Sequence, residues 1–433
     1  MHHLLGLLLT NAPEDRAALE RALVDTPPGT DEVRAWWSAL TTEQRRELET
    51  LAPLAIGNLN GVPWPARIRA NHRTLAELLG DDSHEDLGER LRSMLHANGL
   101  SFIPDHIDHL RERLQALHSG PGFFTRDALP RFLIGFDPER SSVIEYLGHR
   151  IRDTDDAYLS PFADETRFVG LFVPGNDSDP LEFEGKAHTM SEAVYLANGI
   201  AGDNAAGMIV WQGGVFPHGP QVLFAERARK LSAPLARFGN SIPRSPDTAI
   251  VAYGFSFGGA VLGLALRRGL EVDRVVHIAS AGLGHGIAGL DDLPARARVP
   301  HFAMLAPGDA TVGPVQGLNA RLPLLGRLGH GASPVHAKGV VRVETGWLDA
   351  NNPGQLLLGH MSLLEKWGTT AKHTMAALLA GGSVELTAPR RGWWRLAERL
   401  ALPVSPITAR GYVPQRIEVP AARARTRAAN SGQ

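Results

Sequence analysis

Apolar residues recur at spacings of three and four through the N-terminal part of the chain. The segments "EDLGERLRSML" (85–95) and "DHIDHLRERLQALH" (105–118) each place their apolar residues on one helix face. Thr41 and Gln44 have the spacing of a capping box at the start of a further helix. The helical pattern stops at the Gly-Pro-Gly of "HSGPGFF". These patterns predict a helical N-terminal region, residues 1–125, that packs on the domain that follows it.

The pattern then changes to short apolar runs that alternate with helical stretches. Such alternation is typical of a mainly parallel sheet covered by helices. We therefore predict an α/β domain over residues 126–385. After it, residues 386–433 are predicted to hold one more helix, in "RRGWWRLAERLAL", and a basic tail without fixed structure. The predicted strands are "RFLIGF", "SVIEYL", "RFVGLFVPG", "GMIVW", "TAIVAYG", "RVVHIAS", "HFAMLAP" and "GVVRVETG".

The tryptophans of the N-terminal region test whether it is an independent module. If its helices lean on the sheet, Trp36, Trp37 or Trp64 should contact residues beyond 130. Pro63, Trp64 and Pro65 are predicted to form a turn that could not lie inside a helix, because a proline nitrogen carries no hydrogen to donate.

Composition and charge narrow the function classes. The chain of 433 residues is 43% hydrophobic and 21% charged, as expected of a globular protein. Its net charge of -2 gives no general attraction to nucleic acid or to an anionic membrane. The absence of cysteine excludes disulfides, thiolate catalysis and cysteine-ligated metals. No stretch has the length of a transmembrane helix, and the N-terminus lacks the features of a signal peptide, so we expect a cytoplasmic protein.

The stretch "IVAYGFSFGGAVLG" points to a catalytic serine. It places Ser256 between Gly254 and Gly258, at the point where a predicted strand turns into a predicted helix. A nucleophilic serine at such a turn is lifted above the edge of the sheet, and the crowded turn requires small residues two positions away on either side. A chance Gly-x-Ser-x-Gly in a glycine-rich chain would lack this strand and helix context. We therefore predict Ser256 as the nucleophile.

Hydrolases of this kind carry the acid and the histidine downstream of the serine, each after a later strand. Asp309 follows the strand "HFAMLAP" on a Pro-Gly turn, and His360 follows the last strand. We predict Asp309 as the acid and His360 as the general base. The alternatives fit the order less well because they lie in a loop, before the last strand or inside the final helix: Asp291, Asp292, His330, His336 and His373.

The developing oxyanion needs two backbone donors at the same sheet edge. The N–H of Phe257 and that of Gly175 or Asn176, in the loop after "RFVGLFV", are the candidates. We expect Phe255, Trp211 and Gln212 to contact the substrate, although Trp211 could equally be a core residue.

Several motifs together resemble an actinobacterial family of α/β-hydrolases that has long been classed as a domain of unknown function. The resemblance runs from Pro27 to Gly382 and implies an α/β-hydrolase fold preceded by helices, with Ser256, Asp309 and His360 at the triad positions. The serine corner departs from the usual Gly-His-Ser-Tyr-Gly, because phenylalanines flank the serine. The motifs are "PPGTDEVRAWWSALTTEQRREL", "IGNLNGVPWPARIRAN", "VPGN", the serine corner, "SAGLG", "APGD" and the "GH" before the closing helix.

Three other interpretations compete with a hydrolase. The Gly-x-Gly-x-x-Gly at 284–289 follows a strand and could bind a dinucleotide, but no long helix follows it. His106 and His109 are one helical turn apart and could bind a metal, although a solvated helix surface explains them more simply. The hydrolase fold could also serve as a non-catalytic docking protein whose helical region binds a partner.

The sequence as a whole favours a serine hydrolase that cleaves carboxylic esters in an esterase-like or lipase-like reaction. No cofactor and no metal are predicted. The expected partner is a small or lipid-like ester and not a nucleic acid, and the basic tail with Arg423, Arg425 and Arg427 is expected to be solvated.

Overall fold

The computed structural model describes residues 2–79, 123–124, 129–176, 178, 183–312, 316–322 and 326–424. The predicted helices at 85–95 and 105–118, with His106 and His109, and the end of the basic tail lie outside these residues. Among the described residues, no helix is long and apolar enough to cross a membrane.

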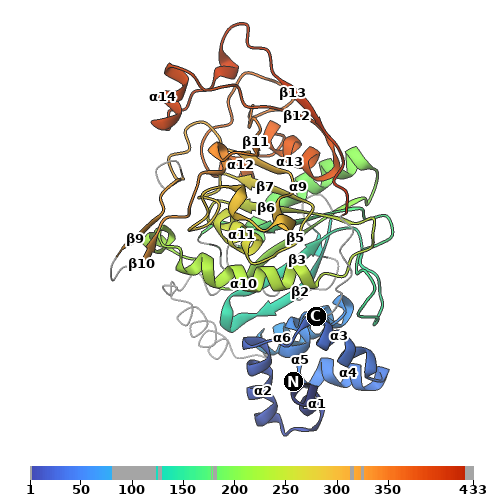
Figure 1. Cartoon of the computed structure of the whole chain (residues 1–433). Helices are drawn as coiled ribbons and strands as arrows, with labels where there is room; N and C mark the ends of the chain where they lie inside the picture. Colours follow the sequence, from blue (N-terminus) through green and yellow to red (C-terminus); the bar gives the residue numbers. More distant parts are fainter. Residues whose placement is uncertain are drawn as a thin grey trace.

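Helices form the start of the chain (Figure 1, blue). The predicted capping box is confirmed: the Thr41 side chain accepts from the N–H of Gln44, and the Gln44 side chain accepts from the N–H of Thr41. A cluster of buried residues that includes Trp36 and Trp37 holds these helices together. The helices are α1 (His2–Thr10), α2 (Pro13–Asp25), α3 (Thr30–Ala39), α4 (Thr42–Leu51), α5 (Pro53–Asn58) and α6 (Trp64–Leu79).

The start of α6 corrects one prediction. Trp64 is the first residue of α6 and Pro65 is the second, so both lie inside a helix. A helix tolerates proline in its first turn because the N–H groups there have no intrahelical acceptor.

Nine described strands form one central sheet, in the order β1-β2-β3-β5-β4-β6-β7-β8-β11. The strands from β5 to β11 are parallel, whereas β1, β2 and β3 pair with their neighbours in antiparallel fashion. The strands are β1 (Phe123–Phe124), β2 (Pro130–Asp137), β3 (Ser142–Leu147), β4 (Phe168–Val173), β5 (Ala206–Gly213), β6 (Ala249–Phe255), β7 (Arg274–Ile278), β8 (His301–Met304) and β11 (Val340–Arg342). All eight predicted strands are confirmed. The helical prediction for 1–125 is wrong at β1, which pairs with β2.

Helices cover both faces of the sheet (Figure 1). Helices α9 (Phe183–Ala201) and α13 (Thr370–Ala380) pack on one face, over a core that includes Phe172, Tyr253 and Met375. Helices α10 (Glu226–Ser241) and α11 (Phe257–Arg267) pack on the other face, over a second core. Parallel strands buried on both faces explain why the sequence shows continuous apolar runs there.

The helical region contacts the sheet through β2, β3 and the loop that follows them. Trp64 packs edge-on against Phe162, with ring centroids 5.2 Å apart, and lies 5.5 Å from Tyr146. The Trp37 indole N–H donates to the carbonyl of Asp155. The predicted contact of these tryptophans with residues beyond 130 is therefore confirmed.

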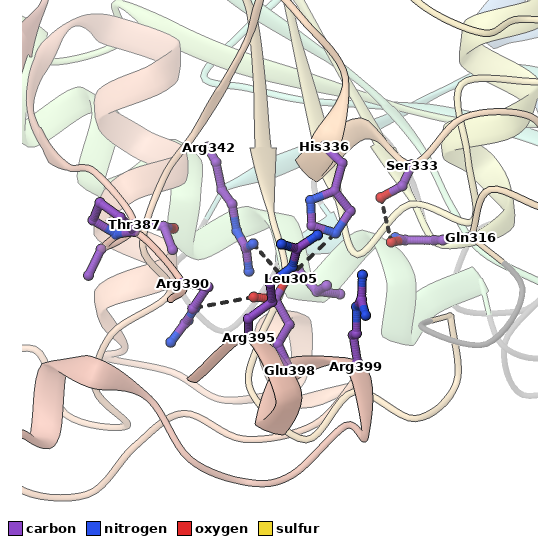
Figure 2. Close-up of a pocket in the computed structure, with 12 residues that line it drawn as sticks. Leu305, Gln316, Ser333, His336, Arg342, Thr387, Arg390, Arg395, Glu398 and Arg399 are labelled. Atoms are coloured by element: carbon purple, nitrogen blue, oxygen red, sulfur yellow. Dashed lines mark hydrogen bonds and ion pairs between the residues drawn. The ribbon is translucent and has the colours of Figure 1, made fainter. Parts of the chain in front are cut away.

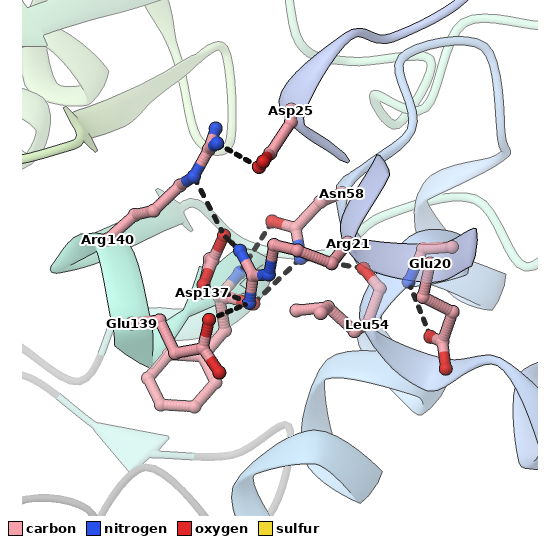
Figure 3. Close-up of polar contacts among 10 residues, drawn as sticks. Glu20, Arg21, Asp25, Leu54, Asn58, Asp137, Glu139 and Arg140 are labelled. Atoms are coloured by element: carbon pink, nitrogen blue, oxygen red, sulfur yellow. Dashed lines mark hydrogen bonds and ion pairs between the residues drawn. The ribbon is translucent and has the colours of Figure 1, made fainter. Parts of the chain in front are cut away.

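Polar groups complete this contact (Figure 3). The Asn58 amide donates to the Phe136 carbonyl at 2.7 Å and accepts from the Phe136 N–H at 3.2 Å. This one side chain therefore satisfies both backbone groups of a residue in β2. Arg21 forms an ion pair with the buried Asp137 at 2.7 Å. Arg140 pairs with Asp25 across the same contact.

The chain continues beyond β11 with further helices and strands. It forms α12 (Ser362–Glu365), α13, a two-stranded sheet of β12 (Gly382–Glu385) and β13 (Arg416–Val419), and α14 (Trp393–Arg399). The helix predicted after residue 385 is confirmed as α14, but β13 was not predicted. A second small sheet pairs β9 (Ala320–Leu322) with β10 (Gly326–Leu328).

Candidate active site

Ser256 occupies the turn between β6 and α11. Its backbone dihedrals, φ 52° and ψ −124°, are strained for a residue with a side chain. Three backbone hydrogen bonds hold the residue in this state. Its N–H donates to Ile278, and its carbonyl accepts from Gly259 at 3.1 Å and from Ala281 at 2.9 Å. The loop after β7 therefore fixes the position of Ser256.

The glycines around Ser256 are required by close contacts. A Cβ atom on Gly254 would lie 2.7 Å from the Cα of Gly259. A Cβ atom on Gly258 would overlap the carbonyl oxygens of Val173 and Pro174, at the end of β4. The small residues predicted to flank the serine thus allow α11 to approach the neighbouring strands.

Asp309 and His360 form a hydrogen-bonded pair. The carboxylate Oδ2 of Asp309 lies 2.8 Å from Nδ1 of His360; the Asp309 side chain is buried and that of His360 is 9% exposed. The second oxygen of Asp309 accepts from the N–H groups of Thr311 and Val312, which fixes the carboxylate in the turn after β8. Because an ionised carboxylate only accepts, Nδ1 of a neutral His360 carries the proton and Nε2 has the free lone pair.

The His360 ring lies next to the serine turn. It packs against the ring of Phe255, with ring centroids 4.8 Å apart and an angle of 32° between the planes. Phe255 directly precedes Ser256. The Gly359 N–H donates to Pro307, so the histidine loop is also joined to the turn that carries Asp309. Within the described residues, His360 Nε2 is buried without a hydrogen-bond partner, so the structure joins the histidine to the acid but not to the Ser256 hydroxyl.

The loop after β4 lies against the serine. A Cβ atom on Gly175 would be 3.1 Å from the Cβ of Ser256 and 3.1 Å from the ring of Phe255. The N–H of Phe257 is the first of α11 and has no acceptor within that helix. Phe257 and Gly175 thus flank Ser256, and Asn176 follows in the same loop. Their role as oxyanion donors stays a prediction.

Trp211 and Gln212 lie near the end of β5 and are fully buried or nearly so. Trp211 belongs to the core that includes α10 and α11. The Gln212 side chain donates to the carbonyl of Ser141 at 2.9 Å. Contact of either side chain with a substrate stays a prediction.

The alternative acids and bases have other partners. The His330 imidazole is bound to the carbonyl of Val222, and burial lowers the pKa of this histidine. Asp292 accepts from the N–H of Ala288 in its own loop. His336 Nε2 lies 3.9 Å from Oε1 of Glu398.

The glycine-rich segment 284–289 opens no long helix. Two short 3-10 turns, Leu290–Asp292 and Ala295–Ala297, follow it before β8. A dinucleotide pyrophosphate would therefore lack the helix N-terminus that binds it in dinucleotide folds.

The strand order, the strand-to-helix serine turn and the acid and histidine after later strands define an α/β-hydrolase fold, as the resemblance implied. Residues 163–315 match the family described as alpha/beta hydrolase. The match shows this central region of the chain to be similar to that alpha/beta hydrolase family. The match is narrower than the range from Pro27 to Gly382 over which the motifs resemble the family.

Two uncharacterized proteins of Mycobacterium tuberculosis, from the strains CDC 1551 / Oshkosh and ATCC 25618 / H37Rv, are each 46% identical to the chain over 68 residues. These residues are 15% of this chain, and they span only 10% of the length of each relative.

Solved structures of hydrolases give a weaker likeness. Aspergillus fumigatus lipase B matches at 14% identity and a TM-score of 0.32, over 81% of this chain and 89% of that one. A dienelactone hydrolase-like promiscuous phosphotriesterase from metagenomic libraries matches at 14% identity and a TM-score of 0.25, over 40% of this chain and 65% of that one. At these TM-scores the likeness carries no conclusion about this chain.

Proposed function

We propose that the protein is a serine hydrolase that cleaves carboxylic esters, with Ser256 as nucleophile, His360 as general base and Asp309 as its positioning acid. The observation that carries this proposal is the strained serine turn at the same sheet edge as the Asp309–His360 pair, in which Nε2 of His360 has no hydrogen-bond partner among the described residues. Strain of this kind persists where the surrounding structure holds it, and it gathers at functional sites.

In the proposed reaction the Ser256 hydroxyl attacks the acyl carbon of the ester, and its proton passes to Nε2 of His360. The negative charge on the carbonyl oxygen is stabilised by the N–H of Phe257 and by that of Gly175 or Asn176. His360 then gives the proton to the leaving alcohol, and an acyl-serine remains. A water molecule, deprotonated by His360, hydrolyses the acyl-serine and restores the hydroxyl.

The lack of a hydrogen bond between His360 Nε2 and the Ser256 hydroxyl in the described structure is compatible with this reaction. Hydrogen bonds between nucleophile and base are often long in the absence of substrate and shorten when it binds. Asp309 holds the proton on Nδ1, which keeps Nε2 ready to accept.

The test is covalent labelling by a fluorophosphonate probe together with hydrolysis of p-nitrophenyl esters of several chain lengths. Ser256→Ala should abolish both, whereas Ser383→Ala, which changes an exposed serine on β12, should change neither. Mass spectrometry of the labelled peptide should place the probe on Ser256.

Hydrolysis by Ser256→Ala at the parent rate would disprove the assignment. A folded parent protein that neither labels nor turns over any ester, amide or thioester would instead favour the non-catalytic docking alternative.

A further inference from the structure

A cavity of about 650 Å³ lies beside the acid turn and is not used by the proposed reaction. Figure 2 shows its walls, which come from parts of the chain far apart in sequence. The end of β8, the end of β11, the 3-10 turn Pro334–His336 and α14 all contribute. The lining residues that matter below are Arg342, Arg390, Arg395, Arg399, Glu398 and His336.

The lining is strongly basic. Among the described residues that line it, four guanidinium groups face one carboxylate, Glu398, which leaves a net charge of +3 with His336 neutral. A second carboxylate, Glu344, acts electrostatically on Arg390 but does not line the cavity. Even with Glu344 counted, positive charge is in excess.

Glu398 is already engaged by the inner arginines. It pairs with Arg342 at 2.7 Å and with Arg390 at 3.3 Å, and His336 lies 3.9 Å away. Figure 2 shows these side chains converging on the carboxylate. The single negative charge of Glu398 is therefore shared between two guanidinium groups and neutralises only one of their two positive charges.

The outer arginines have no acidic partner in the described structure. Arg395 and Arg399 are one turn apart on α14 and are exposed, and Figure 2 shows Arg399 pointing toward Gln316. Their charge acts on His336 across the cavity. Burial lowers the pKa of His336, and the positive charges of Arg342, Arg395 and Arg399 lower it further. The negative charge of Glu398 raises this pKa. The cavity thus has a positive field, and two of its guanidinium groups have no acidic partner in the part of the chain that the structure describes.

The cavity adjoins the proposed active site. Leu305 lines it four residues before Asp309. Gln316, on its opposite wall, donates to the carbonyl of Ser280 at 2.6 Å, and the next residue, Ala281, donates to Ser256. The wall of the cavity therefore touches the loop that holds the serine.

We propose that this cavity binds a phosphate group through Arg395 and Arg399, with Arg342 and Arg390 supplying positive charge behind them. A phosphate carries more charge than a carboxylate and offers more acceptor oxygens, so it can bind several guanidinium groups that approach from different sides. The site lies outside the Ser256 turn, and the proposal does not depend on ester hydrolysis.

The phosphate could belong to a soluble molecule or to a lipid. On α14, Trp393 and Leu396 are 57% and 48% exposed, which gives this helix an apolar surface next to its arginines. Such a surface favours contact with a bilayer whose headgroups reach the cavity. The experiment therefore needs one arm for each source.

In the first arm, binding of inorganic phosphate and of glycerol phosphate to the full chain is measured by calorimetry. The double variant Arg395→Gln, Arg399→Gln should weaken phosphate binding about tenfold or more, because it removes both free guanidinium groups. Arg391→Gln is the matched control, since it removes an exposed arginine beside the same helix that does not line the cavity. Circular dichroism should show that both variants fold.

In the second arm, co-sedimentation with phosphatidylglycerol vesicles is compared with co-sedimentation with phosphatidylcholine vesicles. Phosphatidylcholine carries a phosphate but no net charge. If the parent protein binds phosphatidylglycerol vesicles and not phosphatidylcholine vesicles, and the double variant loses this binding, an anionic lipid headgroup is the source of the phosphate. Calorimetric binding without a vesicle preference identifies a soluble phosphate.

Two results would overturn the proposal. One is the absence of binding in both arms, and the other is an equal loss in Arg391→Gln and the double variant, which would indicate attraction by general charge. Both results are independent of probe labelling at Ser256, so this proposal and the proposed function can fail separately.

Discussion

Asp309 and His360 are hydrogen-bonded at 2.8 Å although 51 residues separate them in the chain. The chain between them forms the small sheet of β9 and β10 and then β11, the last strand of the central sheet, so the pair joins segments on either side of these elements. Asp309 is further fixed by two backbone N–H groups, and the Gly359 N–H is bound to Pro307 in the acid turn. Such a pair fixes both the orientation and the tautomer of the histidine.

Asp309→Asn should therefore reduce kcat for ester hydrolysis by about 10³- to 10⁴-fold, with little change in thermal stability, because an amide can stabilise the wrong tautomer of His360. Initial rates and thermal melting of the purified variant check this. Asp292→Asn is the control, since Asp292 was an alternative acid and lies in a separate loop. An undiminished rate in Asp309→Asn, or an equal loss in Asp292→Asn, would remove Asp309 from the mechanism.

Gly258→Ala should destabilise the protein even though alanine favours helices. The new Cβ would overlap two backbone carbonyl oxygens, those of Val173 and Pro174, which cannot move without disturbing β4. We expect a loss of about 3 kcal/mol in the free energy of unfolding, as for other overpacked sites.

Gly199→Ala is the matched control for this prediction. Gly199 lies in α9 with nothing near its Cβ position, so alanine there should add about 0.5–1 kcal/mol of stability. Urea unfolding of both variants measures the difference. Similar stability in the two variants would show that α11 and β4 are less tightly packed than the structure indicates.

Local sequence patterns were sufficient to predict the strands, the serine turn and the capping box. Each depends on neighbouring residues: apolar runs for the strands, glycines two positions from Ser256, and a hydroxyl and an amide three positions apart at Thr41 and Gln44. The order of acid and histidine followed from the resemblance and from strand positions. Their hydrogen bond could only be seen in the structure.

Features that depend on distant segments were missed. The cavity brings Arg342 together with arginines some fifty residues later, around residues 390 to 399, and no local pattern links them. Strand β13 pairs with β12 across the segment 386–415 that includes α14, and the alternation of its four residues is too short to mark a strand by itself. The predicted turn at Pro65 was wrong because a proline just after one helix and a proline in the first turn of the next helix look alike in sequence.

Asn58→Ala should weaken the contact between the helical region and the sheet. The Asn58 amide satisfies both backbone groups of Phe136, and its removal leaves them unpaired near the end of β2. We expect a loss of about 1–3 kcal/mol, measured by chemical unfolding. Asn352→Ala, in an exposed turn, should have almost no effect. An equally small effect in Asn58→Ala would show that the apolar contact around Trp64 alone holds the region in place.

A pair of buried histidines should make the protein sensitive to acid. His277 on β7 and His301 on β8 lie side by side, with Nε2 of the first 3.3 Å from Nδ1 of the second. His301 Nε2 lies 3.1 Å from the Ala297 carbonyl, so it carries the proton, and Nδ1 is left to accept from His277. Burial lowers the pKa of His301 to about 4, and burial together with His301 lowers the pKa of His277 well below its usual value.

Both folded-state pKa values lie below the unfolded value near 6.5, so between pH 6.5 and pH 4 the unfolded chain binds more protons than the folded one. The pair therefore removes stability as the pH falls through this window. Glu20 has the opposite effect on stability, because burial raises its pKa to about 7 and the folded state therefore binds a proton at a higher pH than the unfolded chain does.

Comparing the parent with a variant isolates the contribution of the histidine pair. His277→Leu should flatten the fall in melting temperature between pH 6.5 and pH 4.5. His373→Gln, on the exposed side of α13, should leave the parent curve unchanged. A His277→Leu curve parallel to that of the parent would mean that these imidazoles are protonated as readily in the folded state as in the unfolded one.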